Sequence, residues 1–124
     1  MAGNAHKTIL ICEDEAALRE LVRAILGPEY HFAEASEGDE ALALIEDLQP
    51  DLVVLDLMLP GKSGLEVLSA LRSNRSSGTT PVVVVTAWTH AEEAVLAAGA
   101  DRFISKPFEP DELQATVEEL LAAA

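Results

Sequence analysis

The stretch Leu52-Val-Val-Leu-Asp56 holds four apolar residues in succession and then stops at a carboxylate. A short run that is apolar at every position is typical of a strand in a parallel sheet that helices cover on both faces. Strand-like runs that end in polar residues recur along the chain, at Thr8–Asp14, Val82–Thr86 and Arg102–Lys106. The repeated unit is therefore a strand followed by a side chain that can bind or react.

Strand-like and helix-like segments alternate five times, which predicts a doubly wound α/β domain. The predicted strands are Thr8–Cys12, Tyr30–Ala35, Leu52–Leu55, Val82–Val85 and Arg102–Ser105. Between them, apolar residues recur at helical spacing. Ser36–Asp39, Ser63–Glu66 and Thr89–Glu92 have the spacing of a capping box at a helix start. Pro110 suits the first turn of the last helix.

Composition also predicts the order of the strands. The third and fourth strands are apolar throughout, which suits the centre of a sheet, whereas the second and fifth include polar residues, as edge strands do. We therefore expect a five-stranded parallel sheet in the flavodoxin-like order 2-1-3-4-5. Right-handed crossovers would place every loop that follows a strand at one edge of this sheet, where such folds bind ligands.

The overall composition excludes several classes of protein. The 124 residues carry a formal net charge of −14, so no basic stripe is present to bind nucleic acid or an anionic membrane directly. No apolar run approaches the roughly 20 residues of a membrane span, and Met1–Lys7 shows no signal peptide. Cys12 lies alone in an apolar run, which favours a buried structural thiol and a cytoplasmic location.

The carboxylates at the strand ends would repel one another strongly if no cation were bound between them. Glu13, Asp14 and Asp56 supply three carboxylates, while Thr86 and Lys106 add a hydroxyl and an ammonium group. Two carboxylates about 6 Å apart repel by roughly 3 kcal/mol at an effective dielectric constant near 20. Taken singly, these residues have ordinary interpretations, such as a helix N-cap for Asp14 or a solvated side chain for Lys106. Together they indicate a site for a divalent cation and a phosphoryl group.

Five segments, in this order and spacing, resemble the receiver domains of bacterial two-component response regulators. The segments are Glu13-Asp14, Asp56-Leu-Met-Leu-Pro-Gly-Lys-Ser-Gly64, Thr86-Ala87, Gly99-Ala-Asp101 and Phe103-Ile-Ser-Lys-Pro-Phe108. The resemblance covers roughly Lys7 to Leu121. No repeat, linker or second domain is visible, so we expect a single receiver domain over residues 1–124.

The resemblance implies how a phosphoryl group is received. Asp56 matches the position that accepts it from a phosphohistidine, and positioning and charge stabilisation suffice for a carboxylate nucleophile. Thr86 and Lys106 match the groups that contact the phosphoryl oxygens, with help from the backbone N–H of Ala87.

The resemblance also implies a site for Mg²⁺ or Mn²⁺. Asp14 and Asp56 match direct ligands, Glu13 matches a ligand that acts through water, and Met58 matches a ligand through its backbone carbonyl. Mg²⁺ keeps several of its waters, so one or two carboxylates with substrate oxygens suffice.

A switch is a further implication. Thr86 matches a residue that moves toward the phosphoryl group, and Phe103 matches an aromatic that turns inward, which changes the face around the fourth helix, fifth strand and last helix. Phe103 would also fit an ordinary buried strand position. The Lys106–Pro107 bond matches a cis peptide bond.

Two features depart from the family pattern. Thr86 and Lys106 are about two residues closer than usual, which leaves only His90–Ala98 for the fourth helix and puts the common dimer mode in doubt. Glu13 stands where Asp is more frequent, which lengthens the reach to a metal. We expect a monomer or a weak dimer.

The function implied is a phosphorylation switch that catalyses only its own phosphorylation and dephosphorylation. Its partners would be a histidine kinase or a histidine phosphotransfer protein and an output domain or downstream protein. The leading alternative is a phosphatase with Asp56 as nucleophile, but that class needs an acid where Met58 stands. An FMN carrier is a third possibility, although Glu13-Asp14 would repel its phosphate.

Overall fold

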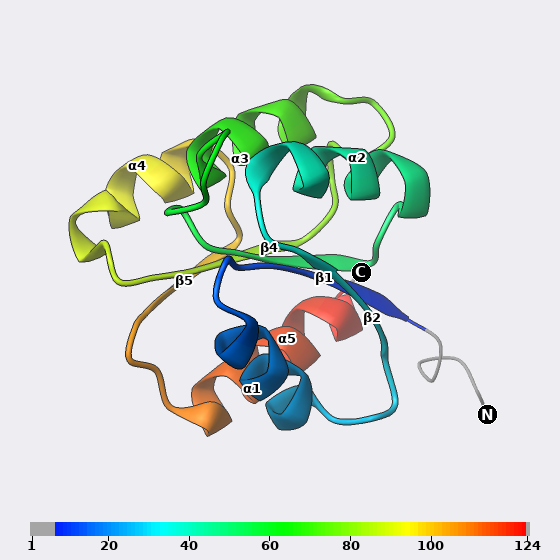
Figure 1. Ribbon diagram of the computed structural model, residues 1–124, viewed down its shortest axis with the longest axis vertical. Helices are drawn as coiled ribbons and strands as arrows, with labels where there is room; N and C mark the ends of the chain where they lie inside the picture. Colours follow the sequence, from blue (N-terminus) through cyan, green and yellow to red (C-terminus); the bar gives the residue numbers. More distant parts are fainter. Residues whose placement is uncertain (1–6, 124) are drawn as a thin grey trace.

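A five-stranded parallel sheet in the order β2-β1-β3-β4-β5 lies at the centre of the computed structural model, which describes residues 7–123 (Figure 1). This confirms the predicted fold class and strand order. Of the segment Met1–Lys7, in which we expect no signal peptide, all but Lys7 lies outside the described residues. The strands are β1 Thr8–Cys12, β2 His31–Ala35, β3 Leu52–Leu55, β4 Val82–Thr86 and β5 Arg102–Ser105. No helix within residues 7–123 is long and apolar enough to cross a membrane.

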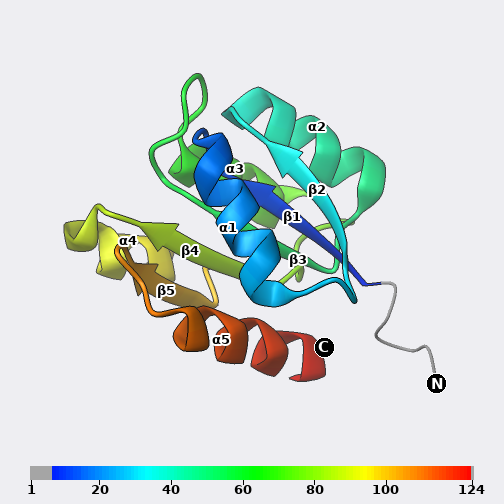
Figure 2. The same ribbon diagram turned by 60° about the horizontal axis from the view of Figure 1, so that its bottom comes forward.

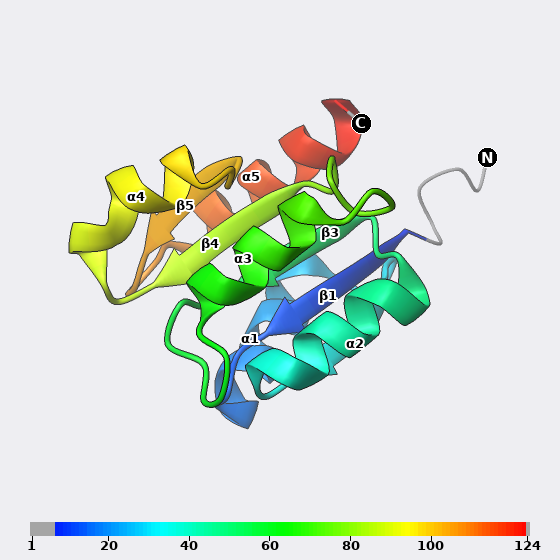
Figure 3. The same ribbon diagram turned by 90° about the horizontal axis from the view of Figure 1, so that it is seen from above.

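Helices cover both faces of the sheet. They are α1 Ala16–Leu26, α2 Gly38–Leu48, α3 Gly64–Ser73, α4 Glu92–Ala97 and α5 Pro110–Ala123, with a 3₁₀ turn, η1, over Thr89–Ala91. Figure 2 shows α1 and α5 on one face, and Figure 3 shows α2, α3 and α4 on the other. Pro110 begins α5, as its fixed φ predicts.

Two hydrophobic cores result from the alternation of side chains along each strand. Leu10 and Cys12 of β1 face α2, α3 and α4, whereas Ile9 and Ile11 face α1 and α5. Each of these four residues is at most 1% exposed. Cys12 is a free thiol whose pKa is raised well above its ordinary value by burial, which confirms the structural interpretation.

One of the three predicted capping boxes forms. The Ser63 hydroxyl accepts from the Glu66 N–H, and the Glu66 carboxylate accepts from the Ser63 N–H. The prediction at Ser36–Asp39 is wrong, because the N–H and hydroxyl of Ser36 both donate to the Glu40 carboxylate instead. Helix α2 starts two residues after Ser36, with no side-chain cap.

The prediction of a capping box at Thr89–Glu92 is also wrong. No side chain caps η1 or α4. The segment forms the 3₁₀ turn first, and α4 begins only at Glu92. This short helix agrees with the limit set by Gly99, whose φ of +111° lies in the left-handed region after the helix ends.

Strand register aligns the ends of the strands on one edge of the sheet. Cys12 is paired with Leu55, and Thr86 is paired with Ser105. Backbone hydrogen bonds extend the alignment one residue further, since the N–H of Asp56 donates to Cys12 and the N–H of Lys106 donates to Thr86. The polar residues that follow β1, β3, β4 and β5 are therefore neighbours in space.

The opposite edge is held by Arg72, at the C-terminal end of α3. Its guanidinium donates to the carbonyls of Gly78, Thr80 and Gly99 and to the Asp101 carboxylate, at 2.7–3.3 Å. These acceptors lie just before β4 and β5, so one side chain joins α3 to the starts of two strands. A neutral residue here would leave several polar groups without their partner.

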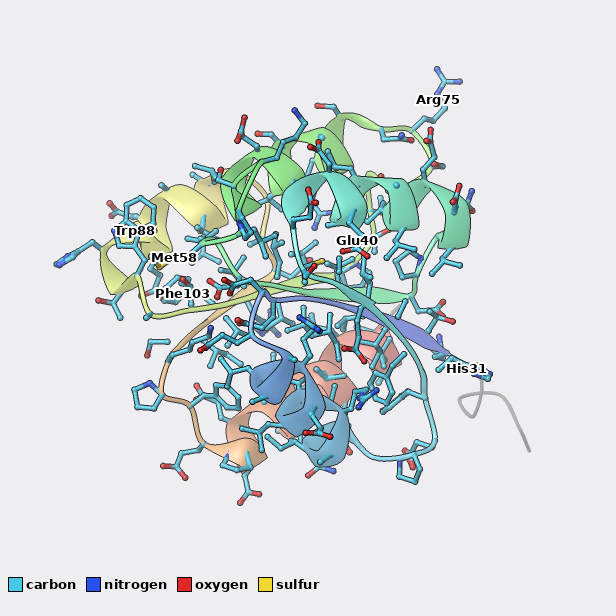
Figure 4. All side chains as sticks on the ribbon, in the orientation of Figure 1. His31, Glu40, Met58, Arg75, Trp88 and Phe103 are labelled. Carbon is cyan, nitrogen blue, oxygen red and sulfur yellow. The ribbon has the colours of Figure 1, made fainter. Side chains whose placement is uncertain are left out.

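We predict that Arg72→Leu lowers the free energy of unfolding by about 2–4 kcal/mol, because four hydrogen bonds are lost and a carboxylate loses its cation. Arg75→Leu is the matched control, since Arg75 points away from the protein (Figure 4) and its replacement should change stability by less than about 0.5 kcal/mol. Urea unfolding measures both. Equal stabilities for the two variants would contradict the role of Arg72.

Candidate functional site

Asp56 lies directly after β3 and is 5% exposed. One of its carboxylate oxygens, Oδ1, accepts a hydrogen bond from the Met58 N–H at 3.1 Å. The start of α3 packs against this segment, and a Cβ on Gly64 would collide with the Asp56 carbonyl and with Leu57. Only glycine at position 64 permits this approach, a requirement that the sequence analysis did not recognise.

Lys106 joins the ends of three strands. Its Nζ lies 2.7 Å from Asp56 Oδ2 and 2.7 Å from Glu13 Oε1. The Lys106 side chain is 19% exposed, and the two carboxylates are 7–8% exposed. Sequence spacing predicted that these three residues would meet, and the structure brings them together. The following bond, Lys106–Pro107, is cis, as the resemblance implied.

The predicted group of three carboxylates is only partly assembled. Glu13 is buried, and its Oε2 accepts from the Glu15 N–H at 3.0 Å, whereas Asp14 is exposed. Among residues 7–123, no three His, Cys, Asp or Glu side chains are grouped so that they could hold a metal ion. The structure therefore places two of the predicted acids on Lys106 and the third beside them in solvent.

Electrostatics differ between the two buried carboxylates. Burial raises the pKa of Glu13, and the hydrogen bonds from Lys106 and Glu15 only partly oppose it. Burial is also the largest influence on Asp56, but Lys106 and the Met58 N–H together outweigh it, so the pKa of Asp56 lies below its ordinary value. Burial acts to lower the pKa of Lys106, yet its two carboxylate partners raise it overall. The same lysine thus lowers the pKa of Asp56 overall but does not overcome the effect of burial on Glu13.

The donor set fits a hard divalent cation. Glu13, Asp14 and Asp56 present carboxylate oxygens, and with Lys106 they leave a net charge of −2. Mg²⁺ needs only one or two carboxylates besides water, so the exposed Asp14 and the buried Asp56 would suffice as protein ligands.

Thr86 and Phe103 occupy neighbouring strands next to this group. Thr86 is fully buried, and its hydroxyl accepts from the Trp88 N–H at 3.3 Å. Phe103 is partly buried and packs against the core beneath α2, α3 and α4. Met58 and Trp88 are 61% and 54% exposed, and Figure 4 shows both on the same side of the molecule as Phe103. Ala87, whose backbone N–H was predicted to help bind the phosphoryl group, is exposed and lies between Thr86 and Trp88 in the chain.

Comparison with known proteins identifies the family. Residues 9–118 match the response regulator receiver domain family, and the chain belongs to this family, whose members act in two-component signal transduction. Among relatives, it is 43% identical over 115 residues to the DNA-binding response regulator MtrA of Mycolicibacterium paratuberculosis. It is 40% identical over 118 residues to the phosphate regulon transcriptional regulatory protein PhoB of Pseudomonas aeruginosa.

The match to these relatives covers most of this chain but only part of theirs. It includes 90% of this chain and 50% of MtrA, and 93% of this chain and 52% of PhoB. The chain thus spans about half the length of the curated relatives it matches. The phosphatase alternative is not favoured, because the family that matches is a signalling module.

Solved structures give the same result. The receiver domain of NtrX from Brucella abortus has a TM-score of 0.85 and 34% identity, over 94% of this chain and 99% of that one. The receiver domain of the sensor histidine kinase PA1611 from Pseudomonas aeruginosa has a TM-score of 0.86 and 25% identity, over 95% and 99% of the two chains. That structure has a magnesium ion coordinated in its active site cleft.

We predict that Lys106→Met lowers the free energy of unfolding by about 3 kcal/mol at pH 7, because Glu13 and Asp56 lose their shared cation. The lowered pKa of Asp56 makes its stabilising effect present above the unfolded pKa of about 4 and lost below the folded one. The raised pKa of Lys106 keeps its contribution present up to about pH 10. The deficit of the variant should therefore be greatest at neutral pH and shrink as the pH falls through 4.

Lys62→Met is the control for this measurement. Lys62 makes an exposed ion pair with Asp39 at 4.0 Å, which should contribute less than about 0.5 kcal/mol. A deficit for Lys106→Met that stays constant from pH 7 to pH 3 would contradict the electrostatic explanation.

Proposed function

We propose that Asp56 accepts a phosphoryl group from the phosphohistidine of a histidine kinase or a histidine phosphotransfer protein. The observation that carries this proposal is the buried Asp56 carboxylate, held 2.7 Å from the Lys106 ammonium at the edge of the sheet where Thr86 and Glu13 also lie. A buried ion pair of this kind contributes little net stability, because removing the charges from water offsets their attraction. Its presence therefore points to a function. Membership of the receiver family indicates which one.

The residues present suit this transfer. A lowered pKa keeps Asp56 ionised, so one of its oxygens can form the new P–O bond as the P–N bond of the phosphohistidine breaks and the imidazole leaves. Lys106 provides a positive charge for a phosphoryl oxygen, and the Thr86 hydroxyl provides a hydrogen bond to another. Phosphoryl transfer requires mainly positioning and charge stabilisation of this kind.

A divalent cation, Mg²⁺ or Mn²⁺, belongs to the proposal. Asp14 and Asp56 would hold it directly, Glu13 through water, and Met58 through its backbone carbonyl. The bound ion would neutralise negative charge between the carboxylates and the phosphoryl oxygens. The exposed position of Asp14 and the net charge of −2 at the site support this assignment.

The response to phosphorylation is proposed to pass through Thr86 and Phe103. Movement of Thr86 toward the phosphoryl group would vacate space beside β5, into which Phe103 would turn. The face formed by α4, β5 and α5 would change, and α4, with six residues, is a short element to reposition. The length of α4 also favours a monomer or weak dimer over the common dimer mode.

The proposed partners are a phosphohistidine donor and an output domain or downstream protein. MtrA and PhoB are described as a DNA-binding regulator and a transcriptional regulatory protein, and both are about twice as long as the match. With a net charge of −14, the receiver itself would not contact nucleic acid or a membrane. A cytoplasmic location fits the free thiol of Cys12. The domain would catalyse only its own phosphorylation and dephosphorylation.

We predict that acetyl phosphate with Mg²⁺ adds one phosphoryl group to the protein, on Asp56, and that EDTA prevents the reaction. Asp56→Asn should abolish it, because an amide cannot serve as the nucleophile. Asp47→Asn, on the exposed side of α2, is the matched control and should react like the parent. Intact mass spectrometry measures the added phosphoryl group. Full phosphorylation of Asp56→Asn would refute the assignment.

We also predict a long-lived phosphorylated state, lasting many minutes. Met58 and Trp88 stand two residues beyond Asp56 and Thr86, where apolar side chains cannot orient a hydrolytic water and can cover the acyl phosphate. Each factor of ten in the hydrolysis rate corresponds to about 1.4 kcal/mol in the barrier. Met58→Asn combined with Trp88→Glu should shorten the lifetime several-fold in a phosphate-release assay.

Leu48→Gln is the control for this lifetime, since Leu48 is also an exposed apolar residue but lies on α2. Loss of phosphate from the parent within seconds would rule out shielding. So would a double variant that keeps the parent's rate, and Trp88 would then be better explained as an anchor for a partner surface.

A further inference from the structure

Arg19, on α1, contacts the loop that carries the acidic pair. Its Nη1 donates to the backbone carbonyl of Glu13 at 2.7 Å, and its Nε donates to the Glu34 carboxylate at 2.7 Å. The Arg19 side chain is 17% exposed. Glu34 belongs to β2, the strand next to β1, where it is paired with Ile11. One guanidinium therefore connects β2 and α1 to the end of β1.

The Glu13 carbonyl oxygen, to which Arg19 donates, is well placed to orient the side chains of Glu13 and Asp14. The Glu13 carbonyl belongs to the peptide group that joins Glu13 to Asp14, and this group is planar. The Glu13 N–H is fixed separately, by a 3.0 Å hydrogen bond to the Ala35 carbonyl. With both ends of the residue held, the direction in which the chain leaves the sheet is fixed. The starting directions of both acidic side chains follow from it.

A guanidinium suits this task better than an ammonium group. Its donors lie in one plane in a fixed arrangement, so it can serve the Glu13 carbonyl and Glu34 at the same time. Arg23, one turn further along α1, donates to the other oxygen of Glu34 at 2.7 Å. Two arginines and one carboxylate leave a positive charge behind the acidic pair, but Arg19 is the one bonded to the Glu13 carbonyl.

We propose that Arg19 is a positioning residue of the phosphorylation site. It holds the Glu13–Asp14 peptide in the orientation in which the two carboxylates bind the divalent cation. This inference rests on the proposed function, because it concerns the cation that phosphorylation of Asp56 would require. Arg19 acts through the backbone of Glu13 and touches no reacting atom. Arg23 is the natural comparison, since it shares Glu34 but is not bonded to that backbone.

The test compares Mg²⁺ affinity in the parent, Arg19→Gln and Arg23→Gln. Fluorescence of Trp88, the single tryptophan, reports binding because this residue lies on the loop directly after Thr86. Residues that orient metal ligands typically change metal affinity by about tenfold or more when replaced. We expect a loss of about that size for Arg19→Gln and less than about twofold for Arg23→Gln. Amide chemical shifts of Glu13 and Asp14 should move in Arg19→Gln only.

Both variants remove an ion pair with Glu34 at 2.7 Å, so an effect that comes from losing this ion pair would appear in both. Equal losses in the two variants, or parent-like affinity in Arg19→Gln, would overturn the inference and leave the proposed function intact. A parent that binds no Mg²⁺ would overturn both. Should Arg19→Gln not fold, Arg19→Lys decides: it keeps the charge but lacks the fork, and affinity equal to the parent's would refute positioning by the guanidinium.

Discussion

The ammonium group of Lys106 between Glu13 and Asp56 is the interaction on which the site depends. It connects residues 93 and 50 positions apart in the sequence, each at the end of a different strand. Two buried carboxylates and a partly buried ammonium group cost several kcal/mol each to remove from water, and the mutual contacts at 2.7 Å offset this cost only in part. The pKa of Glu13 is raised because its contacts do not fully offset the cost of burying its charge. The edge of the sheet is thus held together by charges that a cation or a phosphoryl group would rearrange.

The two ends of the strands differ in the balance of charged and neutral groups around them. At the end of the sheet where β4 and β5 begin, Arg72 donates to three neutral carbonyls and a single carboxylate. At the edge where the strands end, acids outnumber the lysine. Between these two ends, the central strands β1, β3 and β4 are buried on both faces and leave little freedom for adjustment.

Membership of the receiver family accounts for a cluster of acids and a lysine where the strands end. Three further residues around this cluster, Met58, Trp88 and Arg19, are features of this particular chain. Trp88 and Met58 lie exposed, each two residues beyond a site residue, Thr86 and Asp56. Arg19 lies behind the cluster and reaches the backbone of Glu13. Under the proposed function, Met58 and Trp88 would limit access to phosphorylated Asp56, and Arg19 would set the geometry of the two acids.

The elements, the strand order and the residues at the strand ends could be predicted from the chain alone, because hydrophobic periodicity is local and the carboxyl ends of parallel strands lie together. The partners of those side chains became known only from the folded arrangement. It separated the exposed Asp14 from the buried Glu13, which are adjacent in the chain, and it paired Ser36 with Glu40 rather than with a helix start. It also brought Arg19 onto the Glu13 carbonyl, a contact with no sequence signal. Such choices depend on distances between packed elements, which residue spacing along one chain does not contain.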